Sequence, residues 1–358
     1  MISGTVKADP LIVETVNRVC TDLCSPELVN AAEDGDWPSD LWEAMESTGL
    51  SLAWVPEAAG GPGASLADGF AVVRASARFA APVPVAETLC AGWLLAQAGL
   101  QAPAGPMSVA PVRPQEKLAR DAAGLLHGSA NDVPYAGSST HLVVVVSELD
   151  SPLVGLVSAT DCRFASGSNL AGEAQGAVDF EDVRPVDTGY MAGPDPLDAL
   201  QRMGAAIRAQ QMAGALERIL DLSLEYARER VQFGRPIARF QAIQHSLASL
   251  AGEVAAAGAA ADAAASAIIR HGIDDQRTLF TIAAAKIRAG EAAGAGAAIA
   301  HQVHGAMGFT REYSLHHSTR RLWAWRDDFG AESIWAMRLG EIAINGGARA
   351  LWPTLTSL

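Results

Sequence analysis

The residues best suited to chemistry stand in one stretch of this sequence, RERVQFGRPIARFQ, residues 228–241. Arg230 can donate two parallel hydrogen bonds to a phosphate group, and Gln232 can donate its side-chain amide. Phe233 can cover an aromatic ring, and Gln241 returns from the far side of a turn. Together these groups suit a ligand that carries both phosphates and a planar ring. The alternative is a helix end with solvated arginines, because the helix dipole favours Arg in a last turn.

A helix must position this stretch. Leu216 and Ile219 are spaced for one helix face, whereas Gly234 and Pro236 interrupt the helical pattern. We therefore expect a helix that ends near Phe233 and gathers the polar groups at its last turn.

The composition sets limits on the partners. A chain of 358 residues, 49% of them hydrophobic, is long enough for two or three domains with a large buried core. Its net charge of −14 argues against nucleic acid and against an anionic membrane, since both bind through clustered Lys and Arg. A local basic patch for a small phosphate-bearing ligand remains compatible with this net charge.

The cysteines indicate a reducing compartment. The four cysteines show neither CxxC spacing nor a dense framework, so we expect reduced thiols in a cytoplasmic protein: Cys20, Cys24, Cys90 and Cys162. No signal-like segment opens the chain, and the alanine-rich region at 247–269 is interrupted by Glu253 and Asp262. The sequence supports neither secretion nor a membrane span.

Hydrophobic periodicity predicts a mainly α protein with a small central β-domain. Residues 1–104 read as helices, for example at 11–23, 39–47 and 69–80, with Ser39 or Asp40 as an N-cap. Residues 105–192 contain short β-branched runs at 141–147 and 152–160. The Gly60, Gly61 and Gly63 cluster follows no strand, so we interpret it as a structural turn without a ligand.

Residues 193–358 are predicted to form a four-helix bundle. Ile243, Leu247, Leu250 and Val254 step by four, three and four, the pattern of a buried helix seam that Gly272 then closes. Further helices are expected at about 275–304 and 332–350.

These motifs make the chain resemble the acyl-CoA dehydrogenases, flavoproteins that remove two hydrogens from an acyl thioester. The family's RxQFGxPIxxFQ segment contacts the FAD of a neighbouring subunit, so the resemblance assigns FAD contacts to Arg230, Gln232, Phe233 and Gln241. A second motif at 302–321, QVHGAMGFTREYSLHHSTRR, assigns the other half of this contact to Gln302 and Gly305. Residues 41–69 are similar to the family's entry helix and glycine turn, so the resemblance covers nearly the whole chain.

The residues that the resemblance requires for catalysis are missing. In most of the family a glutamate directly before a late glycine takes the α-proton, but Phe329 stands at that position here. Some relatives carry the base earlier, at positions that correspond to Gly204 and Ala205. Asp327 and Asp328 are the nearest carboxylates, and either could replace the base if the backbone shifts by one residue, with Asp328 as the candidate. Alternatively, the two form ion pairs or cap the next helix.

The flavin cradle of the β-domain has also diverged. The family's TEPxxGSD segment is replaced by MSVAPVRP at 107–114, and Val133 and Pro134 stand where a tryptophan strand is expected. The chain thus keeps the motifs that reach a neighbour's flavin and lacks those that hold its own. This asymmetry resembles the unequal α2β2 acyl-CoA dehydrogenases of bacterial steroid degradation.

Three hypotheses follow. The first is a subunit that contributes FAD contacts in trans to a homologous catalytic chain in a heterotetramer, with an acyl-CoA substrate and an electron-transfer flavoprotein as acceptor. The second is a self-sufficient homotetrameric dehydrogenase that uses Asp328 or another displaced carboxylate, and the third is a flavin-free CoA-binding or scaffold relative. His301 and His304 have a spacing that suits zinc, but no Cys or Asp completes a ligand set, so we expect no metal site.

Overall fold

The computed structural model describes residues 7–347 apart from 114, 148–151 and 194, together with residues 349, 352, 353 and 356. The N-terminal third is helical, as predicted. Side chains of Asp9 and Ser25 cap the first two helices, and Ser65 forms a capping box with Asp68. Ser39 is the first residue of its helix and Pro38 the cap, so the predicted N-cap was wrong. The elements are α1 (Pro10–Leu23), α2 (Pro26–Glu33), α3 (Ser39–Ser47), η1 (Leu50–Leu52), η2 (Glu57–Ala59), α4 (Leu66–Arg78) and α5 (Val85–Gln97).

The middle of the chain forms two four-stranded sheets, with strand orders β1-β4-β5-β8 and β2-β3-β7-β6. Strand β4 is buried on both faces: Leu142 and Val144 pack on the second sheet, whereas Val143 and Val145 join the helical core. This explains its continuous apolar sequence. The elements are β1 (Met107–Ala110), β2 (Ala119–Arg120), β3 (Leu126–Pro134), η3 (Ala136–Ser138), β4 (His141–Val146), β5 (Leu153–Ser158), η4 (Ala159–Asp161), β6 (Arg163–Ser168), β7 (Ala174–Val183) and β8 (Asp187–Gly189).

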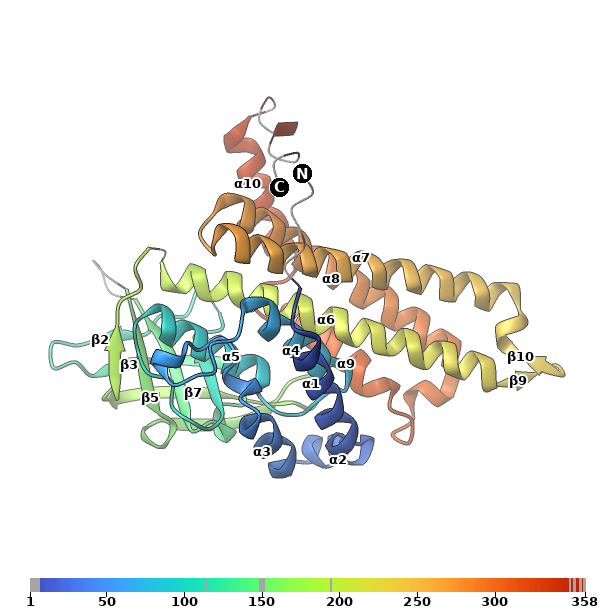
Figure 1. The fold of residues 1–358 in the computed structure, drawn as a ribbon, viewed down its shortest axis with the longest axis horizontal. Helices are drawn as coiled ribbons and strands as arrows, with labels where there is room; N and C mark the ends of the chain where they lie inside the picture. Colours follow the sequence, from blue (N-terminus) through green and yellow to red (C-terminus); the bar gives the residue numbers. More distant parts are fainter. Residues whose placement is uncertain are drawn as a thin grey trace.

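The C-terminal half is built on one central helix, α6 (Pro196–Glu229). It packs against α4, α7, α8 and α9, so side chains around nearly its whole circumference are buried (Figure 1). Gly272 ends α7, as predicted, and α8 begins after its N-cap Asp275, close to the predicted start at about residue 275. The remaining elements are β9 (Val231–Gln232), β10 (Arg235–Pro236), η5 (Ile237–Arg239), α7 (Gln241–His271), α8 (Gln276–His304), η6 (Gly305–Phe309), α9 (Leu315–Asp327) and α10 (Glu332–Gly346).

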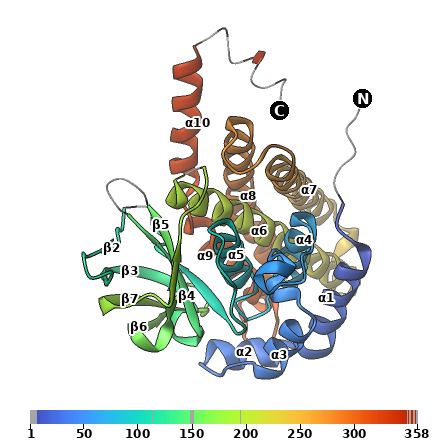
Figure 2. The same cartoon turned by 60° about the vertical axis from the view of Figure 1, so that its left-hand side comes forward.

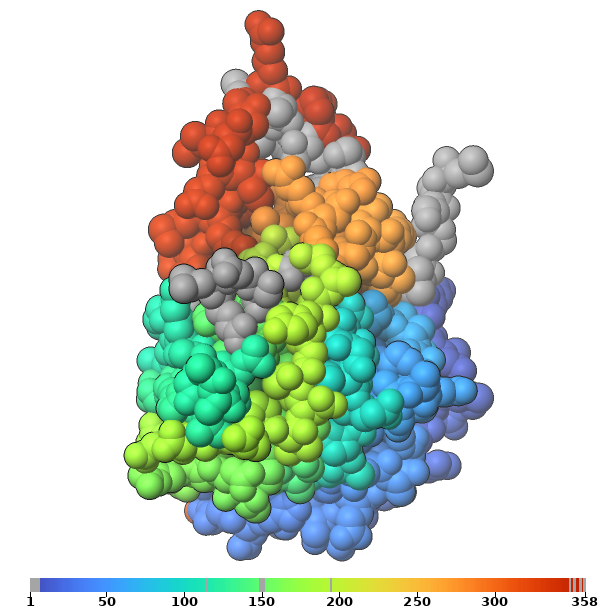
Figure 3. All heavy atoms as spheres, turned by 90° about the vertical axis from the view of Figure 1, so that its left-hand side faces the viewer, coloured from blue at the N-terminus to red at the C-terminus, as the bar shows by residue number. Residues whose placement is uncertain are grey.

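The bundle differs from the prediction in its fourth member. Helix α9, which the sequence pattern did not indicate, packs against α6 and α8, whereas α10 packs against α8 and projects from the body (Figures 1 and 2). In the side view α10 stands above the middle domain (Figure 3). Helix α9 escaped detection because its buried face carries polar residues, among them Thr319 and Arg321. The predicted helix end at Ala350 lies outside the described residues.

One apolar core joins the three parts of the chain. It runs from Val16 in α1 through Leu94 in α5 and Val143 in β4 to Trp335 in α10. Within the described chain, α7 alone has the length and hydropathy to cross a membrane, but its Leu247 and Leu250 pack inside the bundle.

Candidate functional site

The polar groups predicted at the end of α6 lie at one end of the bundle, the right-hand end in Figure 1. The helix ends at Glu229 and not near Phe233, because Val231 and Gln232 leave it to pair with Arg235 and Pro236 in a small antiparallel hairpin.

The tip of this hairpin is strained. Phe233 and Gly234 both have positive φ, 52° and 77°, as in a type I′ turn. Glycine adopts this conformation freely, whereas an aromatic residue pays for it. Phe233 is also 92% exposed, although it lies edge-on to Phe240 at 6.1 Å. Neither local propensity nor burial within this chain explains a phenylalanine here.

Four polar side chains at this end of the bundle have no hydrogen-bond or ion-pair partner within the described part of the chain. Among the described residues, no hydrogen bond or ion pair engages the guanidinium of Arg230 or the side-chain amides of Gln232, Gln241 and Gln302. All four residues are exposed. An unpaired arginine among exposed amides suits an anionic ligand.

The second predicted motif reaches the same end of the bundle. Helix α8 ends at His304, and Gly305 turns the chain with φ 59° and ψ −141°. Ala227, Leu247 and Val303 form a small apolar core that joins the last turns of α6 and α8 to the first turns of α7. The fold thus brings together Arg230, Gln232, Phe233, Gln241, Gln302 and Gly305, which we name the bundle-end corner.

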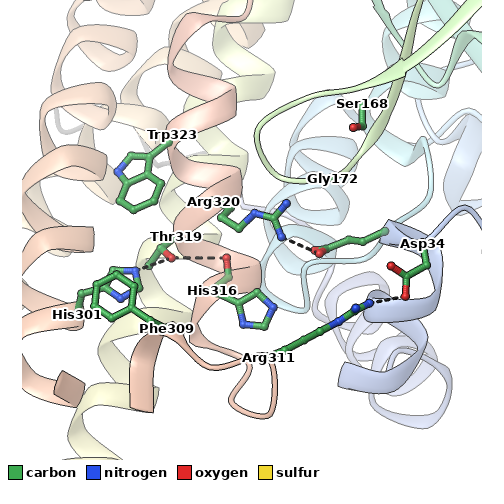
Figure 4. Close-up of a pocket in the computed structure, with 11 residues that line it drawn as sticks. Asp34, Ser168, Gly172, His301, Phe309, Arg311, His316, Thr319, Arg320 and Trp323 are labelled. Atoms are coloured by element: carbon green, nitrogen blue, oxygen red, sulfur yellow. Dashed lines mark hydrogen bonds and ion pairs between the residues drawn. The ribbon is translucent and has the colours of Figure 1, made fainter. Parts of the chain in front are cut away.

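A cavity of about 530 Å³ lies between α9, η6, α2 and the turn joining β6 to β7 (Figure 4). Its aromatic side is a stack: the ring of His301 lies 4.3 Å from Phe309 and 5.9 Å from Trp323, nearly parallel to both. Phe309 remains 71% exposed and offers a surface on which a planar ring can stack.

The charged side of the cavity is internally neutralised. Arg320 pairs with Glu33 at 2.8 Å, and Arg311 pairs with Asp34. The cavity's cations are therefore already engaged, in contrast to Arg230.

A different arrangement surrounds Phe329, the residue at the expected base position. Its ring is buried and lies against the bare backbone of Gly204: a β-carbon built there would be 2.3 Å from Cδ1 of Phe329. The two positions at which a base was expected thus face each other, and the phenyl ring fills the space between them.

Asp328 points into an ion-pair cluster beside this ring. Arg208, which is 2% exposed, binds Glu87 at 2.9 Å and Asp328 at 3.0 Å. Burial raises the pKa of Asp328 and of Glu87, and the Arg208 guanidinium opposes part of that rise. A raised pKa would suit a general base, but this carboxylate is already held by an arginine.

Lys286 lies beside this cluster and binds the backbone on both sides of Phe329. Its Nζ donates to the carbonyls of Arg326 and Gly330 at 2.5 and 2.8 Å, and burial lowers the pKa of Lys286 to about 8. The lysine thereby fixes the end of α9 next to Phe329.

The two segments expected to cradle a flavin lie side by side between the sheets and the bundle. Ser108 donates to the Pro134 carbonyl at 2.6 Å, and Tyr135 is buried beside them. Here Glu173 accepts from Arg321 at 3.0 Å and from the Trp325 indole at 3.0 Å. The chain's own side chains therefore occupy this junction. We use the name interior cluster for the following residues: Arg208, Glu87, Asp328, Phe329, Ser108, Tyr135, Glu173, Arg321 and Trp325.

Sequence reasoning missed the interior cations. Arg208, Lys286 and Arg321 are fully or almost fully buried, and the only sequence signal was an arginine within a run of small residues, AAIRAQ, in α6. No set of three His, Cys, Asp or Glu side chains in the described part of the chain is arranged to hold a metal ion.

Comparison with known families gives two matches. The family described as acyl-CoA dehydrogenase, N-terminal domain, matches residues 8–102. The family described as acyl-CoA dehydrogenase, C-terminal domain, matches residues 199–339.

Individual proteins agree with these matches. The chain is 30% identical over 314 residues to acyl-CoA dehydrogenase IpdE2 of Mycobacterium tuberculosis, covering 86% of this chain and 88% of that protein. A chain of the ChsE4-ChsE5 complex of Mycobacterium tuberculosis superimposes with a TM-score of 0.85 at 24% identity, over 95% of this chain and 98% of that one. The Tcur3481-Tcur3483 steroid ACAD gives a TM-score of 0.83 at 23% identity, over 94% and 97%.

Proposed function

Because this chain belongs to the acyl-CoA dehydrogenase family, whose members are FAD-binding flavoproteins, we propose that it is a subunit of a heteromeric acyl-CoA dehydrogenase. The complex removes hydrogens from the α and β carbons of an acyl-CoA thioester. This chain contributes FAD contacts in trans, and a homologous partner chain supplies the flavin cradle and the catalytic base.

One observation carries the proposal. This chain's own side chains occupy the position of the catalytic base, whereas the polar side chains of the bundle-end corner are exposed and unpaired in the described structure. Phe329 occupies the space at Gly204, and Arg208 holds the nearest carboxylate. A phenyl ring accepts no proton, and a thioester has no room between Phe329 and Gly204.

The bundle-end corner fits a dinucleotide. Arg230 would bind a phosphate bidentately, and the amides of Gln232, Gln241 and Gln302 would donate to the remaining polar atoms. Phe233 would cover a ring, and Gly305 leaves its backbone accessible. The flavin, when bound, supplies a hydride acceptor; these residues hold and orient it, and the corner carries no group that moves a proton.

The interior cluster does not fit a second flavin. A flavin at the junction of sheets and bundle would have to displace Tyr135 and separate Glu173 from Arg321, which would leave buried charges without partners. We therefore assign the chain no flavin of its own and assign Asp328 a structural role.

The substrate class is proposed from likeness. The similarity to IpdE2 supports an acyl-CoA thioester as the substrate. The similarity in fold to a steroid ACAD favours a steroid-derived acyl group. An electron-transfer flavoprotein is the proposed acceptor and the cytoplasm the proposed location.

The test is the visible spectrum of the purified chain with and without a co-expressed homologue that carries the intact TEPxxGSD segment. We expect a colourless protein alone and a yellow, active complex. A yellow and active chain by itself would instead support the self-sufficient dehydrogenase that uses Asp328 or another displaced carboxylate. Lack of colour with every homologous partner would establish a flavin-free scaffold.

A further inference from the structure

Three aromatic rings join the two halves of the bundle-end corner. Tyr226 lies in the last turn of α6, His304 is the last residue of α8, and Tyr313 follows η6. The Tyr226 and His304 rings stack at 4.5 Å with an interplanar angle of 26°, and Tyr313 packs 5.0 Å from His304 and edge-on to Tyr226 at 5.9 Å.

The edges of the His304 ring are fixed as well. Nδ1 lies 2.8 Å from the Ala300 carbonyl, which can only accept, so Nδ1 carries the proton. Nε2 then accepts from the Tyr313 hydroxyl at 3.3 Å. Burial lowers the pKa of His304, against the opposing effect of the Ala300 and Leu222 carbonyls.

Two of the three rings, those of Tyr226 and His304, are linked to corner residues through the backbone. The Tyr226 carbonyl accepts from the backbone N–H of Arg230 at 2.9 Å. His304 directly precedes Gly305, and Gly308 packs so closely that a β-carbon there would be 3.0 Å from Cβ of His304. The apolar core at Ala227 and Val303 joins the helices, whereas the three rings extend the connection past the helix ends to η6.

We propose that the Tyr226–His304–Tyr313 cluster is a positioning group that holds the Gln302–Gly305 turn at a fixed separation from Arg230, so that the dinucleotide-binding corner is formed before any partner binds. This proposal rests on the proposed function. A corner that is already ordered avoids the loss of side-chain and loop entropy on binding.

The first experiment measures the coupling in the chain alone. Backbone hydrogen–deuterium exchange is followed in peptides covering residues 222–232 and 300–313 for wild type, His304→Ala and His304→Phe. We expect His304→Ala to speed exchange about tenfold in both peptides, since local opening then costs less. His304→Phe keeps a stacked ring and loses both ring nitrogens, so its exchange rates should lie between those of wild type and those of His304→Ala. The matched control is His245→Ala, an exposed histidine in the first turns of α7.

The second experiment measures FAD retention in the complex with the co-expressed homologue. His304→Ala should weaken FAD binding about tenfold, the cost of ordering one or two side chains on binding. Arg230→Ala should weaken FAD binding while leaving exchange in both peptides unchanged.

The outcomes separate the two proposals. Faster exchange in 300–313 alone, or FAD retention in His304→Ala equal to that in His245→Ala while Arg230→Ala loses FAD, would overturn the positioning role. If Arg230→Ala retains FAD, the trans contact is wrong, and the exchange data still decide whether the rings couple the two segments.

Discussion

The interior cluster and the bundle-end corner are connected by α6, which carries Arg208 of the cluster and ends directly before Arg230 of the corner, and the two groups differ in how their charges are compensated. In the interior, Arg208 and Arg321 are buried and paired with carboxylates. At the corner, Arg230 is exposed, and no carboxylate in the described chain pairs with it. The interior charges serve folding, whereas the corner charge is available to another molecule.

Strain follows the same division. Phe233 and Phe329 both adopt positive φ, 52° in each case. Phe329 gains burial and a hydrogen bond from the Trp335 indole to its carbonyl at 2.9 Å, which offset the strain. Phe233 is neither buried nor held by such a hydrogen bond, so in the isolated chain no such contact offsets the destabilising effect of its conformation.

The largest expected effect is at Arg208. Replacement Arg208→Met leaves Glu87 and Asp328 in the interior without a counter-charge and should lower the free energy of unfolding by about 3–5 kcal/mol. Urea denaturation measures it. Arg230→Met, at the exposed corner, is the control and should change stability by less than about 0.5 kcal/mol. Equal losses in the two variants would remove the contrast between the regions.

The contact between Gly204 and Phe329 gives a coupled effect. Gly204→Ala should destabilise the chain by about 1–3 kcal/mol, because its β-carbon meets the phenyl ring. In a Phe329→Ala background the same change should be neutral or stabilising, since alanine is the better helix former. Additive effects in this double-mutant cycle would show that the ring does not rest on Gly204.

Arg230→Ala should weaken FAD retention by the complex by about 1–3 kcal/mol through loss of a charge-assisted contact. Equilibrium dialysis with absorbance at 450 nm as readout measures this loss. Arg239→Ala, another exposed arginine at this end, is the matched control. Unchanged flavin occupancy in Arg230→Ala contradicts the assigned role.

Phe233→Asn should stabilise the isolated chain by about 0.5–1 kcal/mol, because asparagine tolerates positive φ better than phenylalanine. The same variant should bind FAD less well in the complex. Chemical denaturation and FAD titration are needed together, and a loss of stability would show that Phe233 has an intramolecular function.

The smallest expected effect is a pH dependence of the free energy of unfolding that arises from His317, near the interior cluster. His317 donates to Asn30 Oδ1 at 2.9 Å, and burial lowers the pKa of His317 to about 3. The folded state therefore resists protonation, so the stability is complete above the unfolded pKa of about 6.5 and is lost as the pH falls. Between pH 7 and 6 the loss is about 0.7 kcal/mol.

His317→Gln, which retains a donor for Asn30, should flatten the pH dependence of the unfolding midpoint. Parallel profiles for the variant and wild type would assign the slope to other groups.

Sequence patterns predicted the elements that depend on local rules. Gly272 marked the end of α7 and residue 275 the start of α8, and short runs rich in β-branched residues marked β4 and β5. The grouping of Arg230, Gln232 and Phe233 could also be predicted from the sequence, because these residues lie within one four-residue stretch. Helix α9 and the interior cluster were not, because Arg208, Asp328 and Glu173 are far apart in sequence and meet only after folding.

The unbroken course of α6 has a consequence for how this chain can change over time. Gly204 lies in this helix and Arg230 directly follows its last residue, Glu229, so inserting or deleting a single residue between them would rotate one end by about 100° and shift it by about 1.5 Å relative to the other. A lineage can therefore exchange the residues at either end, but it cannot alter the length between them without misaligning both.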